Sequence, residues 1–279
     1  MKLISFRHGD RASYGQVIDD QVADFSTLPG APVDLKNAIA EGRLQALSEA
    51  ARPSLAMADV QLLPVIPNPA KILCVGHNYE SHRQETGRAK VSYPSIFTRF
   101  ADTLTAHGAE IVRPKVSDNL DYEGELAVII GKGGRHISEA DALDHVAGYA
   151  PFNEASVRDW QWHTQQFIPG KNFPSTGGFG PWMVTADELP DPATTSVTTR
   201  LNGVVMQSQP TADMLFSVPV IIAYLSAFTE LSPGDVICSG TPGGVGAKRE
   251  PPVWMKPGDV VEVDIPGVGL LHNPVGQEA

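Results

Sequence analysis

Cysteine is scarce in this chain, with only Cys74 and Cys238 among 279 residues. Both lie in apolar runs typical of β-strands, KILCVG and DVICSG, which favours buried free thiols over a disulfide. No Cys-x-x-Cys spacing occurs, which counts against a structural zinc site. The Gly-x-Ser-x-Gly elbow of serine hydrolases is also missing, which counts against that class of enzyme.

Positive charge is also in short supply. The chain has 21 Lys and Arg against 32 Asp and Glu, a formal net charge of -11 at pH 7, and no basic cluster. Such a chain is poorly suited to bind nucleic acid or an anionic membrane, so we expect neither partner. An anionic substrate would therefore need local positive charge, from a metal ion or from a few well-placed Lys and Arg side chains.

No apolar run is long enough to cross a bilayer. The most apolar stretch with a helical pattern, near residues 214–228, is interrupted by Pro219 and is too short. The first residues, MKLISFRHGD, lack the apolar core of a signal peptide. By default we expect a cytoplasmic protein.

The composition and the local patterns predict a β-rich α+β enzyme. An apolar content of 42% and a charged content of 19% are typical of a folded globular chain, long enough for one large domain and a small appendage. Three prolines in VQLLPVIPNPAK mark a boundary near residue 68. We expect a small accessory domain over 1–67 and a catalytic domain over 68–279.

Helices are expected in a few places, with strands elsewhere. Residues 34–50 have a helical pattern with Asp34 as N-cap, and 138–150 begin with a capping-box pattern formed by Ser138 and Asp141. One longer helix is predicted over about 214–230, and short ones in NYESHRQE and RDWQWHTQQF. The pair Asn202-Gly203 predicts a hairpin turn, and the two PGDV segments, at 233–236 and 257–260, each predict the start of a strand.

Two glutamates stand out in the strongest strand candidate, YEGELAVIIG. Glu123 and Glu125 are two residues apart and therefore point to the same face of a strand whose neighbours are apolar. Two buried like charges need a cationic partner. Glu154, in FNEAS, offers a third carboxylate, and such oxygen ligands suit Mg²⁺, Mn²⁺ or Ca²⁺. Spacing alone leaves an alternative open, in which these glutamates lie at a solvent-exposed strand end and pair with Arg or Lys.

Two further groups have residue types suited to catalysis. His82 and Glu85 are neighbours on one face if NYESHRQE is helical, and a carboxylate beside an imidazole makes a general base. Lys171 lies in a Gly/Pro-rich loop, PGKNFPSTGGFGPW, where functional residues are frequent. Ordinary surface charges remain the alternative for both. The loop SGTPGGVGAKRE lacks the Gly-Lys-Ser/Thr of a phosphate loop, so we expect it to line a pocket.

The motifs together resemble one known family. KILCVGHNYESH, YPSIFTRF, YEGELAVIIG, GYAPFNEASVRDWQ, PGKNF, GPWMVTADE, PGDVICSGTPGGVG and KPGDVVEVDIPGVGLLHNPV are similar in order and spacing to the fumarylacetoacetate hydrolase family, over about residues 68–275. The resemblance implies a mixed β-roll, a small variable N-terminal segment, a homodimer, and Mg²⁺ or Mn²⁺ in the site, with Ca²⁺ as a further candidate.

The resemblance also assigns roles to residues. Glu123 and Glu125 match the family's paired metal ligands, and Glu154 stands where the family typically has aspartate. His82 and Glu85 match a pair that activates water, and Lys171 matches a substrate-contacting lysine. We expect four further residues in these motifs to bind substrate: Tyr79, Arg99 (where many members carry lysine), Gln161 and Thr241.

The implied reaction is cleavage of a C–C bond in a 2,4-dioxo acid such as an acylpyruvate or fumarylpyruvate. The metal would chelate the 2-oxo acid end, His82 would activate water, and a pyruvate enolate would leave. The same chemistry serves isomerases, decarboxylases or hydratases of 2-oxo and 2-hydroxymuconate-type dicarboxylates in aromatic catabolism. A further alternative is a binding protein without catalytic activity, in which Glu154 in place of aspartate disturbs the metal geometry.

Overall fold

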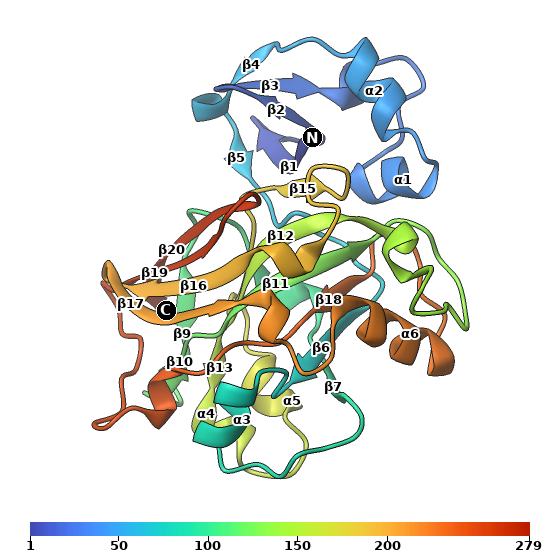
Figure 1. Ribbon diagram of the computed structural model, residues 1–279. Coiled ribbons are helices and arrows are strands. Elements are labelled where there is room, and N and C mark those ends of the chain that lie inside the picture. Colours follow the sequence, from blue (N-terminus) through green and yellow to red (C-terminus); the bar gives the residue numbers. More distant parts are fainter.

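The computed structural model describes residues 1–279 and shows a strand-rich α+β fold, as the sequence predicts (Figure 1). The N-terminal strands and two short helices form the upper part of the view in Figure 1, and the larger remainder lies below them. Short 3₁₀ turns connect many elements: Phe25–Thr27, Met57–Asp59, Ala101–Thr103, Ala142–His145, Pro192–Thr194, Thr211–Asp213 and Gly246–Lys248. No helix is long and apolar enough to span a membrane.

The N-terminal part is antiparallel. Its elements are β1 (Lys2–His8), β2 (Arg11–Ile18), β3 (Gln21–Asp24), α1 (Leu35–Ala40), α2 (Leu44–Ala50), β4 (Leu55–Ala56) and β5 (Gln61–Leu62). Asp34 caps α1 as predicted, since its side chain accepts a hydrogen bond from the N–H of Asn37 at 2.7 Å. The prediction of a single helix over 34–50 is wrong, because two short helices form instead. Gly42, with a φ of 64°, terminates α1 and separates it from α2.

The boundary near residue 68 stays a proposal. The chain crosses there from β5 to β6, but β1 pairs with β15, so the N-terminal strands extend the main sheet. One apolar cluster also combines Leu3 and Phe25 with Ala127 and Phe152 from the larger part.

The main sheet runs through both parts of the molecule. Its strand order is β4-β3-β2-β1-β15-β12-β11-β18-β6-β7, and β5, β8 and β14 pair off this path. The strands beyond the N-terminal part are β6 (Ile72–Gly76), β7 (Ser95–Thr98), β8 (Leu104–Thr105), β11 (Gly124–Ile130), β12 (Val146–Glu154), β14 (Gly177–Phe179), β15 (Met183–Thr185) and β18 (Val236–Cys238).

A second sheet, in the order β17-β16-β19-β20-β9, packs against β11 and β12. Its strands are β9 (Ile111–Arg113), β16 (Ser196–Leu201), β17 (Val204–Pro210), β19 (Val260–Ile265) and β20 (Gly269–Gln277), while β10 (Leu120–Asp121) pairs only with β13 (Ser156–Val157). The Asn202-Gly203 turn joins β16 to β17, and both PGDV segments lead into strands, as predicted. The remaining helices are α3 (Glu80–Glu85), α4 (Arg158–Gln161), α5 (Ile168–Lys171) and α6 (Val218–Phe228).

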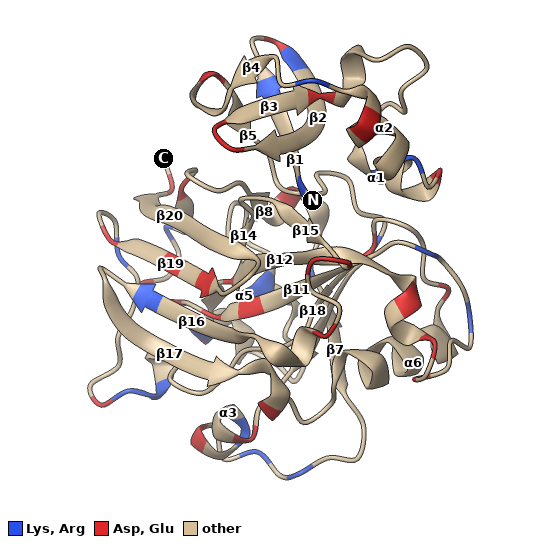
Figure 2. Cartoon of the chain, turned by 45° about the horizontal axis from the view of Figure 1, so that its top comes forward, with Lys and Arg blue, Asp and Glu red and all other residues tan.

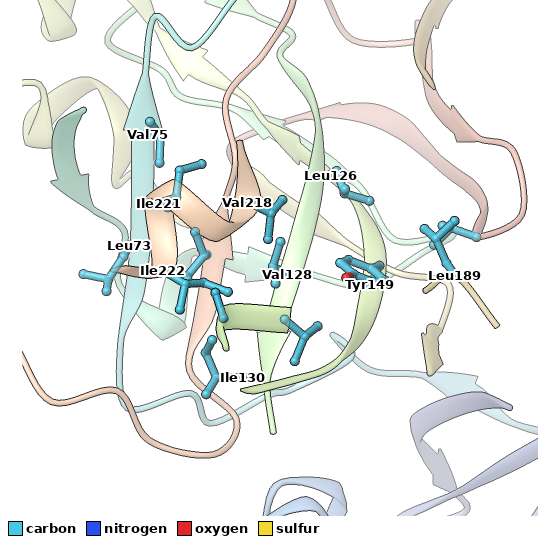
Figure 3. Close-up of a cluster of buried hydrophobic side chains, with 14 of the residues drawn as sticks. Leu73, Val75, Leu126, Val128, Ile130, Tyr149, Leu189, Val218, Ile221 and Ile222 are labelled. Carbon is cyan, nitrogen blue, oxygen red and sulfur yellow. The ribbon is translucent and has the colours of Figure 1, made fainter. Parts of the chain in front are cut away.

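The core explains why β11 is apolar throughout: every residue of this strand is buried. Leu126 and Val128 belong to a cluster with Ile221 and Ile222 of α6, and Figure 3 shows these side chains together. The alternate residues of β11 belong to the cluster that includes the N-terminal part. Charged residues lie mostly on loops, helices and outer strands such as β16 and β19 (Figure 2), so buried glutamates on β11 are exceptional.

The thiols follow the prediction. Cys74 and Cys238 are free and buried, and they are register partners on the parallel strands β6 and β18.

Two predicted helices are shorter than expected, and a third is replaced by a turn and the start of a strand. Residues 138–150 form only a 3₁₀ turn, Ala142–His145, before β12 begins. Ser138 and Asp141 do make the expected capping hydrogen bond, but residues 146–154 pair with β11 instead of continuing a helix. The helix expected over 214–230 spans only α6, which starts at Val218 with Pro219 in its first turn, where a proline is tolerated. The segment RDWQWHTQQF is helical only in α4.

Candidate active site

Three buried carboxylates meet where β11 and β12 pair. Glu123 directly precedes β11, Glu125 is its second residue, and Glu154 ends β12, where its N–H donates to the carbonyl of Glu123 at 2.8 Å. One ligand atom from each of the three lies within 4.8 Å of the others. The carboxylate cluster predicted from the sequence is therefore formed, although Glu154 is about thirty residues from the other two in the chain.

A glycine between the two glutamates fixes the direction in which they point. A Cβ atom at Gly124 would lie 2.0 Å from Oγ1 of Thr199 in the second sheet, so no larger residue fits there. Because side chains alternate along a strand, Glu123 and Glu125 face the other way, into a pocket. Because the second sheet packs closely against Gly124, the side chains of Glu123 and Glu125 both point into this pocket.

Buried cations balance most of this charge. Nζ of Lys171 lies 2.7 Å from Glu123 and 2.8 Å from Glu154, and a nitrogen of Arg158 lies 2.7 Å from Glu123. Lys171 is not in an exposed loop but ends α5, where it is buried. The ion pair left open by the sequence is thus present, with a buried lysine as one partner.

Two arginines extend the charged network. Arg158 also pairs with Asp121 at 2.8 Å, and Arg99 lies 3.3 Å from Glu154. The network therefore holds four buried carboxylates (Asp121, Glu123, Glu125, Glu154) and three buried cations (Arg99, Arg158, Lys171), one positive charge short of balance.

Glu125 is the carboxylate of this network that has no cationic partner. Its one hydrogen bond comes from the backbone N–H of Gly240 at 2.8 Å, and burial together with Glu154 and Glu123 raises its pKa well above the usual range. Burial also raises the pKa of Glu154. At Glu123 the charges of Arg158 and Lys171 outweigh burial and lower the pKa. An all-oxygen cluster that lacks positive charge fits a hard divalent cation well.

His82 and Glu85 form the expected pair on α3. Nδ1 of His82 lies 2.6 Å from Oε1 of Glu85, whose other oxygen accepts a hydrogen bond from the N–H of Gly244 at 2.8 Å. His82 lines the same pocket as the three glutamates, whereas Glu85 does not line it. Since Nδ1 is engaged, Nε2 is the ring nitrogen left for proton transfer.

The four residues expected to bind substrate take different positions. Gln161 and Thr241 line the pocket; Gln161 accepts a hydrogen bond from Arg158 at 2.9 Å, and Thr241 donates one to the carbonyl of Gly124 at 2.9 Å. Arg99 and Tyr79 do not line it. Arg99 instead supports Glu154 from behind, and Tyr79 is fully buried with a hydroxyl that has no hydrogen-bond partner.

Other pocket residues gave no usable signal in the sequence. They include His77, Arg88, Phe97, Arg158, Phe167 and Lys248. The sequence places Arg158 in a short helix, and only its tertiary contacts reveal its ion pairs with Asp121 and Glu123. The Gly-rich loop after β18 does line the pocket as predicted, through Thr241 and Val245.

Comparison with known proteins supports the resemblance. Residues 71–276 match the family described as "Fumarylacetoacetate (FAA) hydrolase C-terminal". Oxaloacetate tautomerase fahd2 of Xenopus laevis is 37% identical over 291 residues, covering 99% of this chain and 90% of that protein. Oxaloacetate tautomerase YisK of Bacillus subtilis (strain 168) is also 37% identical, over 99% of this chain and 100% of that protein.

Solved structures agree with this. A fumarylacetoacetate hydrolase from Exiguobacterium antarcticum superposes with a TM-score of 0.89 at 36% identity, with full coverage of both chains. Maleylpyruvate hydrolase from Sphingobium sp. SYK-6, in complex with manganese(II) and pyruvate, superposes with a TM-score of 0.83 at 29% identity, again with full coverage. The chain therefore belongs to the fumarylacetoacetate hydrolase family of enzymes.

Proposed function

We propose that this enzyme interconverts the keto and enol forms of a short 2-oxo dicarboxylic acid such as oxaloacetate, with the help of a divalent metal ion. The observation that carries the proposal is the convergence of three buried glutamates, Lys171 and a carboxylate-bound histidine on one pocket. Relatives that match almost the whole chain are oxaloacetate tautomerases, which favours this reaction over others of the family.

Glu123, Glu125 and Glu154 would hold the metal. Mg²⁺ and Mn²⁺ are the ions that their oxygens suit best, with Ca²⁺ as a further candidate. When bound, the ion would act as a Lewis acid toward the carboxylate and keto oxygens of a 2-oxo acid. The similarity to a hydrolase that binds manganese supports the same assignment.

His82 would move the proton. Its Nε2 takes a proton from C3 of the keto acid, the C3–H electrons form the C2=C3 double bond, and the imidazolium returns the proton to the oxygen on C2. Glu85, at 2.6 Å from Nδ1, holds the ring and stabilises the imidazolium while it exists. Lys171 lines the pocket with a permanent positive charge, which favours the negative charge that develops on the C2 oxygen.

The outer part of the pocket would bind the second carboxylate of the substrate. Arg88 and Lys248 line the pocket, and the cation of each rests over an aromatic ring, at 5.7 Å from the centre of Phe167 and 5.8 Å from that of Trp162. Neither side chain forms an ion pair within the chain, so both charges are available to an anion.

A second candidate is hydrolysis of the C–C bond in a 2,4-dioxo acid such as an acylpyruvate. It is favoured by the His82–Glu85 pair, which could equally deprotonate a water molecule for attack on the distal carbonyl. The similarity to maleylpyruvate hydrolase points the same way. This reaction shares the pocket and the proposed metal but adds water to the substrate.

Product analysis separates the two. The purified enzyme is incubated with oxaloacetate and with a panel of acylpyruvates, with and without Mg²⁺ or Mn²⁺, and followed by NMR. Tautomerisation gives one product of unchanged mass, whereas hydrolysis gives two acids. Metal-dependent acceleration of keto–enol exchange is the expected result. Cleavage of acylpyruvates without any effect on oxaloacetate would favour the second candidate instead.

A further inference from the structure

His77 has a backbone conformation that histidine rarely adopts. It directly follows β6 with a φ of 55°, in the left-handed region where glycine and asparagine are the common residues. The next residue is held firmly in the fold, since the side chain of Asn78 donates hydrogen bonds to the carbonyls of Phe216 and Ser239, at 2.9 and 2.7 Å. The turn does not require an imidazole ring, so the ring at this position calls for another explanation.

The ring of His77 lies against the ring of His82. Their centroids are 5.1 Å apart and their planes differ by 13°, which is a stacked arrangement. His77 also meets Phe167 edge-on, with the ring centroids 6.3 Å apart, and Phe167 meets Phe97 with centroids 5.8 Å apart. All four rings line the pocket, so they form a row that ends at the proposed base.

We propose that His77 is a positioning residue that fixes the ring plane of His82 by stacking and so directs Nε2 toward the substrate. The inference rests on the proposed role of His82 as the base. One hydrogen bond, donated by Nδ1 of His82 to Glu85, holds a single atom of the imidazole and leaves the ring free to rotate about that contact. A second ring against its face removes this freedom, and Phe167 in turn keeps the second ring in place.

The charge state of His77 suits this role. Burial, followed by the nearby charge of His82, lowers the pKa of His77 to about 4. At neutral pH its ring is therefore uncharged and does not repel the imidazolium that His82 becomes during the reaction.

Two substitutions separate the ring from the turn. His77→Asn removes the ring but tolerates the left-handed backbone, whereas His77→Phe keeps a ring that can stack and removes both nitrogens. We expect His77→Asn to lower kcat for oxaloacetate tautomerisation about tenfold with KM changed less than about twofold, because a misdirected catalytic group costs rate more than binding. His77→Phe should restore most of the rate. Thermal unfolding of both variants checks that they fold.

A double-mutant cycle tests the route through His82. If His77 acts by orienting that ring, His77→Asn should have no further effect in a His82→Ala background. A wild-type kcat in His77→Asn would overturn the inference. So would a His77→Phe variant as slow as His77→Asn, because the nitrogens and not the ring face would then matter, or an undiminished effect in the His82→Ala background. Full activity of His82→Ala alone would instead remove the proposed base, which distinguishes the two failures.

Discussion

Oε2 of Glu154 lies 2.8 Å from Nζ of Lys171, and both side chains are buried. The lysine thus bridges two of the three carboxylates that we assign to a metal, since it also contacts Glu123. One ammonium cannot satisfy the whole cluster, and Glu125 has no cationic partner of its own within the chain. A divalent ion would supply the charge that the protein leaves out.

Removing Glu154 should weaken metal binding. Glu154→Gln keeps the shape of the side chain but loses one ligand charge, and we expect its affinity for Mn²⁺ to fall at least about tenfold. Glu154→Asp should still bind, because the carboxylate remains and is only one methylene shorter. Titration calorimetry with MnCl₂ measures both, and the exposed Glu139→Gln serves as the matched control. Wild-type affinity in Glu154→Gln would mean that this residue is not a ligand.

Loss of His82 should slow the reaction and spare the metal. General base catalysis is typically worth about 10²–10⁴-fold, so His82→Ala should lower kcat by that order. Glu85→Gln should lower kcat less, because the imidazole remains but is held less firmly. Steady-state kinetics and Mn²⁺ titration of the same preparations give the two readouts, with the exposed His8→Ala as control. If His82→Ala lost its metal instead, the residue would be a ligand rather than the base.

Neutralising the outer cations should impair recognition of a diacid. Arg88→Met and Lys248→Met should each raise KM for oxaloacetate several-fold, because each removes a charge-assisted contact at an exposed site, while kcat changes little. Lys115→Met removes the same charge at an exposed site away from the pocket and should leave KM unchanged. Equal KM values in all four proteins would place the second carboxylate elsewhere.

Gly240 should not tolerate a side chain. Its φ is 103°, and a Cβ atom would lie 2.6 Å from Cβ of Asn78, while its N–H is the donor to Glu125. We expect Gly240→Ala to lower the free energy of unfolding by more than the roughly 1–3 kcal/mol of backbone strain alone and to weaken Mn²⁺ binding. Gly258 has a φ of 90°, but no atom lies within 4 Å of the place of its Cβ atom, so Gly258→Ala measures the backbone strain without a clash. Urea unfolding compares the two, and equal losses would argue against the clash.

Ionised Asp24 should stabilise the fold, so that the free energy of unfolding falls at acid pH. Burial alone would raise the pKa of Asp24, but hydrogen bonds from Ser13, Ser26 and Arg11 outweigh it and lower the pKa. A lowered pKa gives stability that is present above the unfolded value, about 4, and is lost as pH falls through the folded one.

The matching measurement is urea unfolding of wild type and Asp24→Asn at several pH values. The difference in free energy of unfolding should be constant from neutral pH to about pH 5 and shrink below about pH 4. Asp20→Asn, on the exposed turn before β3, is the control. A difference that grows toward low pH would contradict the assignment.

Sequence patterns alone predict the strand-rich class, the buried thiols and the shared face of Glu123 and Glu125. These follow from short-range patterns: β11 is apolar on both faces, which only a strand covered on both sides can be, and Glu123 and Glu125 share a face because side chains alternate. His82 and Glu85 are likewise neighbours through helical spacing alone. In both pairs the partners lie within a few residues of each other, whereas Glu154 is about thirty residues from Glu123 and Glu125.

Only the tertiary structure decided which distant groups meet. Residues 138–150 have a helical start, yet 146–154 become a strand because pairing with β11 outweighs local propensity. Lys171, predicted in a loop, is buried between two carboxylates, and Arg158 gave no signal at all, because its ion pairs join segments that are far apart in the chain. The stacking of His77 on His82 likewise depends on a left-handed turn that sequence spacing does not specify, and Asn78, the next residue, is held there by long-range hydrogen bonds.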